Sequence, residues 1–354
     1  MSIYAIWNNK GGVGKSYLTF QIASEYAIQN PSKKVLVLDL CPQANSSSMF
    51  LGGMIEGEKH LSEIHSSDKG KTISGYIEER ISSLYSPTNS GASYLTHVSE
   101  YNSNIPENLY LVVGNELLEL QSSKVSGATN PGPEEAWRIV HLWIRDLIID
   151  INQLWNEEEF CIFIDCNPSF TIYTELAIIA SERLIIPFSA DGSSLRSVKS
   201  VLSLVYGVRR HKNEQQSGFY LNAVVKHKMI LPGIYMYIGN RLTQMYNSSA
   251  SAFKTVVNEI GKEIWDVWQH NDAQFCLHPN GSSPKPNNKK SFNSMFRYEI
   301  NDANTASVVS GALGIPISKL RDGMYPVARK ETKVNNSQLE KQAPNIQELA
   351  KKIE

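Results

Sequence analysis

The sequence contains few cysteines, no paired C-x-x-C motif and no long apolar run. Its four cysteines lie at positions 41, 161, 166 and 276, so no disulfide framework is indicated and we expect reduced, mostly buried thiols. No apolar run approaches the roughly 20 residues of a membrane-spanning helix, and no secretory signal precedes the first predicted strand. These absences predict a cytoplasmic protein.

An excess of charge of one sign is also missing. The formal net charge is −1, from 34 Lys and Arg against 35 Asp and Glu. Whole-chain electrostatics therefore do not indicate nucleic-acid binding, which would need a local basic patch. With 354 residues, 42% of them hydrophobic and 19% charged, the chain can bury a sizeable core, in one large α/β domain or in two.

Short apolar runs alternate with helical patterns along the chain. A run without polar alternation is typical of a parallel strand whose two faces are both covered by helices. We therefore predict an α/β fold with a doubly wound, mostly parallel sheet and a site at the carboxyl ends of its strands. The predicted strands are residues 3–7, 34–38, 109–113, 160–164, 183–187 and 219–225.

Helical spacing of apolar residues predicts one helix that follows the first strand and ends near Pro31, a second over 134–155 and a third over 195–205. The segments near 85–105 and 278–293 are rich in turn-forming residues and are expected to be irregular insertions. We predict a single domain over residues 1–320, followed by a polar tail or a short helix over 321–354.

Residues 8–16 have the composition of a phosphate-binding loop. They follow the first predicted strand and open a helix, which is the context that such a loop requires. The glycines would let backbone N–H groups wrap around an anion at the helix N-terminus. Lys15 would bind the β- and γ-phosphates, and the Ser16 hydroxyl would ligate Mg²⁺. The predicted nucleotide-binding residues are Lys10, Gly11, Gly12, Val13, Gly14, Lys15, Ser16 and Tyr17.

A second lysine, Lys10, opens this loop, and the pattern from Lys10 to Ser16 resembles the deviant Walker A motif of the ParA/MinD ATPase family. Residues 35–45 look like the second motif of the family, a strand that ends in Asp-x-Asp-Pro-Gln, and residues 160–169 look like its Walker B strand. The resemblance covers residues 1 to about 225 and is closest to ParA-type partition ATPases. It implies a single P-loop ATPase domain that binds ATP and Mg²⁺.

The resemblance also implies roles for individual residues. The family lysine at the position of Lys10 reaches the phosphates bound by the partner subunit, which implies a homodimer that forms on ATP binding; a solvated surface lysine is the alternative interpretation. Asp165 ends an apolar strand and would hold a water on Mg²⁺, as Walker B acids do, or would simply cap the next helix. Asp39 would act on the water shell of the metal. Ser16, Asp39 and Asp165 thus form the predicted metal site.

Two positions depart from the family pattern. Cys41 stands where the family has its second carboxylate, which orients or activates the attacking water, and a thiol with a pKa near ~8.5 is a poor replacement. The candidate catalytic residues are therefore Lys10, Asp39 and Cys41, and we hypothesise that hydrolysis is slow or lost while ATP binding persists. Tyr17 stands where the family usually has a Ser or Thr that contacts the α-phosphate, so only its backbone N–H is left for that contact.

Candidate partners follow from the same resemblance. MinD-like relatives use a C-terminal membrane helix, but residues 345–354 are short and lack an aromatic anchor, so a packing helix or a frayed tail is favoured over a membrane contact. ParA-like relatives bind nonspecific DNA as ATP dimers. The DNA-contacting candidates, with solvated surface charge as the alternative, are Lys226, Lys228, Lys285, Lys289, Lys290, Lys319, Arg321, Arg329 and Lys330.

These observations predict a ParA-like switch for DNA partitioning or cargo positioning, with slow or partner-stimulated hydrolysis. It would be cytoplasmic, nucleoid-associated if it binds DNA, and would work with a ParB-like or adaptor protein. The alternative is a hydrolysis-deficient scaffold that dimerises on ATP and recruits a protein partner. Cys41 is the residue that separates the two.

Overall fold

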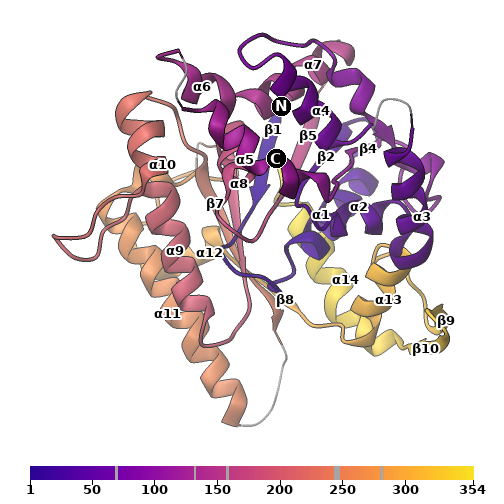
Figure 1. Cartoon of the computed structure of the whole chain (residues 1–354). Helices are drawn as coiled ribbons and strands as arrows, with labels where there is room; N and C mark the ends of the chain where they lie inside the picture. Colours follow the sequence, from indigo (N-terminus) through magenta and orange to yellow (C-terminus); the bar gives the residue numbers. More distant parts are fainter. Residues whose placement is uncertain (68–70, 131–132, 157–158, 243–247, 280, 282) are drawn as a thin grey trace.

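A central eight-stranded sheet organises the molecule (Figure 1). The computed structural model describes residues 1–67, 71–130, 133–156, 159–242, 248–279, 281 and 283–354. The strand order is β3-β4-β2-β5-β1-β6-β7-β8, and all pairs are parallel except β3 with β4 at one edge. The predicted doubly wound, mostly parallel sheet is confirmed. The strands are β1 (Ser2–Ile6), β2 (Lys34–Leu40), β3 (Thr96–His97), β4 (Leu109–Val112), β5 (Phe160–Cys166), β6 (Arg183–Phe188), β7 (Gly233–Leu242) and β8 (Arg297–Asn301).

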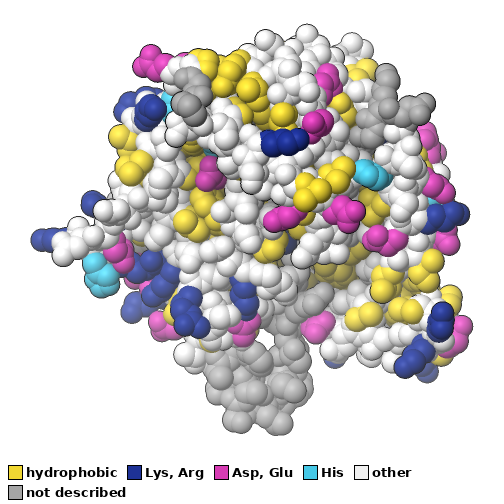
Figure 2. Space-filling view, in the orientation of Figure 1, with side chains coloured by type: hydrophobic (Ala, Val, Ile, Leu, Met, Phe, Trp, Pro, Cys, Tyr) yellow, Lys and Arg dark blue, Asp and Glu magenta, His cyan; other side chains and the backbone are white. Residues whose placement is uncertain are grey.

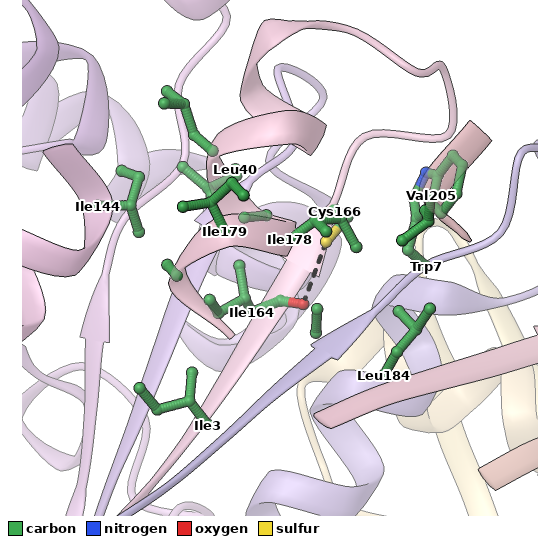
Figure 3. Close-up of a cluster of buried hydrophobic side chains, with 14 of the residues drawn as sticks. Ile3, Trp7, Leu40, Ile144, Ile164, Cys166, Ile178, Ile179, Leu184 and Val205 are labelled. Atoms are coloured by element: carbon green, nitrogen blue, oxygen red, sulfur yellow. Dashed lines mark hydrogen bonds between the residues drawn. The ribbon is translucent and has the colours of Figure 1, made fainter. Parts of the chain in front are cut away.

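The central strands send alternate side chains into two separate hydrophobic cores. In and just after β1, Ile3 and Trp7 belong to one core, whereas Tyr4 and Ile6 belong to the other. Figure 3 shows part of the first core, with Cys166 packed among isoleucines. That core is closed by α4 (Ile73–Ser82), α5 (Leu117–Ala128), α6 (Ala136–His141), α7 (Trp143–Leu154), α8 (Ile172–Ala180), α9 (Ser194–Tyr206), α11 (Ser248–His270) and α12 (Lys289–Phe296).

The second core lies between the sheet and the helices on its opposite face. Figure 1 shows the C-terminal elements, in yellow, beside the indigo helices that follow the first two strands. Segments from the two ends of the chain therefore close the same core. The helices are α1 (Lys15–Gln29), α2 (Asn45–Phe50), α3 (Gly53–His65), α13 (Thr305–Leu313) and α14 (Asn336–Ala350).

The strand predicted at 219–225 is wrong. This segment forms a helical turn, α10 (Gly218–Tyr220), that continues into a π-helical turn, η3 (Leu221–Lys226). The Ser217 hydroxyl caps it by accepting the Tyr220 N–H at 3.1 Å. Burial follows helical spacing, because Phe219 and Ala223 are buried while Leu221 and Val225 are exposed. The strand next to β6 comes later, as β7, after Pro232.

The long helix predicted over 134–155 is two helices. It begins at Ala136 and is interrupted between α6 and α7 by a turn at Leu142, whose φ of −89° and ψ of −6° deviate from ideal α-helical values. The Leu142 N–H still bonds to the carbonyls of Arg138 and Ile139, so the interruption leaves that donor satisfied.

The helix predicted over 195–205 is confirmed as α9.

The two segments expected to be irregular contain short elements. Residues 85–105 include β3 and two 3₁₀ turns, η1 (Gly91–Tyr94) and η2 (Val98–Glu100). Within 278–293, residues from Lys289 onward are helical, because Asn288 and Ser291 form a capping box that starts α12. The irregular prediction is therefore wrong for residues 289–293; residues 280 and 282 lie outside the described part of the chain.

The segment 321–354, predicted as a polar tail or a short helix, contains the hairpin β9 (Gly323–Val327) and β10 (Lys330–Val334), followed by α14. Ile346, Leu349 and Ile353 are buried against the body of the protein, which confirms the packing interpretation of residues 345–354. Within the described residues, every helix is too short or too polar to cross a bilayer.

Candidate nucleotide-binding site

The loop between β1 and α1 has the backbone of an anion-binding turn. Gly12 and Gly14 have φ of +76° and +82°, which side chains rarely tolerate, and no heavy atom lies within 4 Å of a Cβ built on Gly11 or Gly12. A side chain at either position would fill the hollow in front of the loop. Gly14 is also the N-cap of α1, so the free N–H groups of the first helical turn lie beside this hollow. The geometry fits a bound phosphate group.

Lys15 lies inside the loop. Its side chain is buried, and Nζ donates to the carbonyl oxygens of Lys10 at 2.7 Å and Asn8 at 3.3 Å. Burial lowers the pKa of Lys15, and the nearby carboxylate of Asp165 opposes that shift. An ammonium held by two carbonyls can exchange them for phosphate oxygens, which are stronger partners because they are charged.

Lys10 points the other way. Its Nζ contacts Asp191, the Ser189 hydroxyl at 3.2 Å and the Ser194 hydroxyl at 3.3 Å, all between the end of β6 and the start of α9. Burial alone would raise the pKa of Asp191, but hydrogen bonds from Lys10, Ser189 and Ser193 outweigh it and hold that pKa below its usual range. The side chain of Lys10 is thus held away from its own loop by an ionised carboxylate. No spacing in the sequence pointed to Asp191.

Asp39 is fully buried at the end of β2. Its Oδ1 accepts the Cys41 N–H at 3.0 Å, and its Oδ2 accepts both the N–H and the hydroxyl of Ser47, at 3.0 and 2.7 Å. Burial raises the pKa of Asp39, and these hydrogen bonds oppose the shift. The Ser47 hydroxyl also accepts the Gly114 N–H at 2.9 Å. Asp39 therefore connects β2, α2 and the end of β4, and its metal role remains a prediction.

Cys41 lines the cavity in front of the loop but is only 3% exposed. Burial, followed by the carboxylates of Asp39 and Asp165, raises the pKa of Cys41 to about 12. The thiol is therefore protonated near neutral pH. A protonated thiol cannot accept a proton from the attacking water, so Cys41 cannot act as the general base that the missing carboxylate would supply, and it is also a poor nucleophile.

Asp165 lies beside Asp39 in register on the neighbouring strand β5 and is fully buried. Burial, followed by repulsion from Asp39, raises the pKa of Asp165 to about 7. Neither of its oxygens has a hydrogen-bond partner in the described part of the chain, although the Ser16 and Ser46 hydroxyls lie close enough to moderate the shift. An unpartnered carboxylate beside the loop and the Ser16 hydroxyl fits a hard divalent cation, which prefers oxygen ligands.

Tyr17 turns its side chain away from the loop. Its hydroxyl donates to Gln342 Oε1 of α14 at 2.7 Å, so the side chain attaches α1 to the C-terminal helix. Any contribution to phosphate binding from Tyr17 must come from its backbone. The phosphate contact of its N–H group stays a prediction, and the structure adds a structural role for the ring hydroxyl.

A cavity of about 730 Å³ opens in front of the loop. Its lining comes from the loop and the start of α1 together with residues of α2, α3 and α13. Sequence analysis missed α13 entirely, because the motifs end long before it. It also missed Asn240 near the end of β7. The side-chain amide of Asn240 donates to the Val13 carbonyl at 2.9 Å and so attaches the loop to β7. The α13 residues at the cavity are Ser307, Val308, Gly311 and Ala312.

The basic residues considered for DNA binding do not form one continuous surface. Lys226 lies at the end of η3 beside α10, whereas Arg329 and Lys330 lie at the β9–β10 hairpin, on the opposite side of the view in Figure 1. Lys285 is paired with Asp272 at 2.7 Å. Figure 2 shows lysine and arginine side chains next to acidic ones over the visible face. DNA contact by these residues remains a prediction.

Residues 1–217 match the model of a family described as an AAA domain, AAA_31, whose members are ParA/MinD-like P-loop proteins. The chain belongs to this family. The match covers the loop, both carboxylate-bearing strands and α9, and it confirms the resemblance drawn from the Walker motifs. No curated protein matches the sequence of this ParA/MinD-like chain.

Solved structures of the same fold class include two of McdA from Cyanothece. Apo McdA is 16% identical, with a TM-score of 0.58 over 90% of this chain and 92% of that one. The ATP complex of a McdA variant is 16% identical, with a TM-score of 0.60 over 100% and 97%. A putative plasmid partition protein from Borrelia burgdorferi, bound to AMPPNP, is 19% identical over 73% and 80%, with a TM-score of 0.45. At these identities the McdA structures show that the fold is shared along almost the whole chain.

Proposed function

We propose that this ParA/MinD-like chain binds ATP and Mg²⁺ and dimerises on them, acting as a switch that positions DNA or another cargo. The arrangement of the two lysines carries the proposal. Lys15 lies inside the phosphate loop, whereas Lys10 is held outside it by Asp191. Lys15 would therefore serve the nucleotide of its own subunit, and Lys10, on leaving Asp191, would serve the phosphates of a partner subunit.

The residues that would hold the nucleotide are those of the loop. Backbone N–H groups of residues 11–17 would surround the phosphates, Lys15 would exchange its carbonyl partners for phosphate oxygens, and the Ser16 hydroxyl would ligate Mg²⁺. Asp165 would hold a water of the metal. Bound Mg²⁺ would neutralise phosphate charge, and it would also favour the ionised form of Asp165, whose pKa burial has raised to about 7.

Cys41 determines how fast such a switch resets. Because its thiol is buried and protonated, the chain lacks a base at the position where its family resemblance predicts one. We therefore expect slow hydrolysis that a partner protein stimulates. This observation also favours a second candidate, a scaffold that dimerises on ATP and scarcely hydrolyses it.

The Cys41→Asp variant distinguishes these two candidates, with Cys41→Ser as a control of similar size. Strongly increased phosphate release at unchanged ATP affinity would favour the scaffold, because the natural chain then lacks only the catalytic carboxylate. Ordinary family turnover by the wild-type protein would refute slow hydrolysis in both.

The partners are proposed from the family resemblance and from the names of proteins of similar fold. A ParB-like or adaptor protein and nonspecific DNA are the candidates, and DNA contact would place the protein on the nucleoid within the cytoplasm. Size-exclusion chromatography with and without ATP and Mg²⁺, repeated with nonspecific DNA at two salt concentrations, tests the proposal. A nucleotide-dependent dimer that binds DNA less tightly as salt rises would support the switch on DNA. A chain that stays monomeric with ATP and Mg²⁺ would refute both candidates.

A further inference from the structure

The carboxyl ends of β2 and β5 bring two buried carboxylates together. Asp39 and Asp165 are direct register partners, and both are fully buried. Two adjacent carboxylates repel each other when both are ionised, so such a pair normally needs a cation or several hydrogen-bond donors. The two members of this pair differ in the number of donors that they have.

Asp39 is supplied with donors. The Cys41 N–H, the Ser47 N–H and the Ser47 hydroxyl all donate to it, and Gly114 approaches so closely that a Cβ there would lie 2.7 Å from its Cγ. These contacts fix Asp39, and through Ser47 they fix the start of α2. The residue before Ser47 is thereby held at a set position relative to the two strand ends.

That residue is Ser46, and its hydroxyl is buried without a hydrogen-bond partner. Both oxygens of Asp165 are also buried and unpartnered. Ser46 directly precedes Ser47, whose N–H and hydroxyl both donate to Asp39, and Asp39 is the register partner of Asp165, so Ser46 lies at the same end of the two strands as both carboxylates. A buried donor and a buried acceptor that both lack partners are unfavourable in the protein interior, and pairing them with each other would remove both penalties.

We propose that Ser46 is a positioning residue for the divalent cation, acting through Asp165. The Ser46 hydroxyl donates to one carboxylate oxygen of Asp165, and this fixes the other oxygen toward the water shell of a cation held at Ser16. The inference rests on the proposed ATP- and Mg²⁺-dependent function. It adds a residue that neither the Walker motifs nor the loop includes.

The role of Ser46 predicts a selective effect on the cation. Groups that hydrogen-bond to metal ligands typically change metal affinity about 10- to 100-fold when removed, and Ser46, which acts through Asp165 and a metal-bound water, belongs at the lower end of that range. In the Ser46→Ala variant, the Mg²⁺ concentration that half-maximally tightens binding of a nonhydrolysable ATP analogue should rise by about tenfold. Binding of the same analogue in EDTA should be unchanged, because the loop, Lys15 and the cavity are untouched.

The experiment is a titration of full-length protein with a fluorescent, nonhydrolysable ATP analogue at a series of Mg²⁺ concentrations. Ser46→Thr keeps a hydroxyl and should stay within about threefold of wild type, whereas Ser46→Cys keeps the approximate volume, replaces the hydroxyl with a weak donor and should behave like Ser46→Ala. The matched control is Ser24→Ala, because Ser24 on α1 is also buried with an unpartnered hydroxyl but lies in none of the contacts above. It should leave the Mg²⁺ dependence unchanged.

Two results would overturn the role of Ser46. One is a Mg²⁺ dependence in Ser46→Ala and Ser46→Cys that matches wild type. The other is an equal loss of nucleotide affinity with and without Mg²⁺, which is the result expected of a purely structural residue. Failure of the wild-type protein to bind the analogue under any condition would instead refute the proposed function, and the role of Ser46 with it.

Discussion

The contact between Lys10 and Asp191 should oppose dimerisation and so raise the dissociation constant of the dimer. If Lys10 serves the partner subunit, it must leave Asp191, Ser189 and Ser194 before a dimer can form. Removing the charge of Asp191 should therefore favour the dimer. The Asp191→Asn variant keeps an oxygen that can accept the Ser193 N–H, which bonds to Asp191 Oδ1 at 3.0 Å, so the turn before α9 should persist.

The size of the effect follows from exposure and symmetry. The side chains of Lys10 and Asp191 are 22% and 46% exposed, so the ion pair belongs to the screened class, which contributes about 0.2–1 kcal/mol. A twofold dimer breaks two such pairs, which gives about 0.4–2 kcal/mol in the dimerisation free energy. The dissociation constant of the nucleotide-bound dimer should thus fall about 2- to 30-fold in Asp191→Asn. Higher salt should reduce the difference in this dissociation constant between Asp191→Asn and wild type, because salt screens the ion pair.

Sedimentation velocity over a range of protein concentrations, with Mg²⁺ and a nonhydrolysable ATP analogue, measures this constant. Asp302→Asn is the matched control, because Asp302 Oδ1 likewise accepts a backbone N–H two residues on, from Asn304 at 2.9 Å, but has no lysine partner in the described chain. Equal dissociation constants for Asp191→Asn and wild type would refute the claim that the Lys10–Asp191 contact opposes dimerisation. So would an equal shift in the control, which would assign the effect to net charge alone.

Three further predictions concern stability. Gly114→Ala should lower the free energy of unfolding by about 1–3 kcal/mol in urea denaturation, because its Cβ would lie 2.7 Å from the fixed Asp39 carboxyl carbon; an unchanged midpoint and slope would contradict this. Tyr17→Phe should cost about 1 kcal/mol by the same measurement through loss of the Gln342 hydrogen bond, while nucleotide affinity in a titration stays within about twofold. Burial lowers the pKa of His278 to about 4, so between about pH 6.5 and 4 the unfolded chain binds a proton that the folded chain does not. The free energy of unfolding should therefore fall by up to about 3 kcal/mol as the pH drops through that range. In His278→Gln, urea denaturation at a series of pH values should show this loss of stability removed.

The order and spacing of motifs predicted the central sheet because each strand there is a continuous apolar run next to a recognisable turn. The prediction failed at 219–225, where a run of similar composition is helical. Ser217 caps that segment, and Leu221 and Val225 face solvent at helical spacing. Neither feature can be seen in a count of hydrophobic residues. Short apolar runs do not distinguish a strand from a helical turn without the tertiary contacts.

The loop residues of the site were predictable because their roles depend on local backbone shape and on spacing within nine residues. The contacts that orient them were not. Lys10 is held by Asp191, Tyr17 by Gln342 and the Val13 carbonyl by Asn240, and each of these partners is more than 180 residues away in the chain. Sequence spacing carries no signal for such long-range pairs when only one sequence is considered.

The participation of α13 and α14 in the cavity and in the support of α1 has a consequence for synthesis on the ribosome. The part of the chain that matches the family model, residues 1–217, emerges first and contains every recognisable motif. It lacks β7 and β8, the α13 wall of the cavity and the Gln342 partner of Tyr17. A nascent chain therefore carries the complete phosphate loop long before it has a complete nucleotide cavity, and it should become competent for nucleotide only after α13 and α14 have left the exit tunnel.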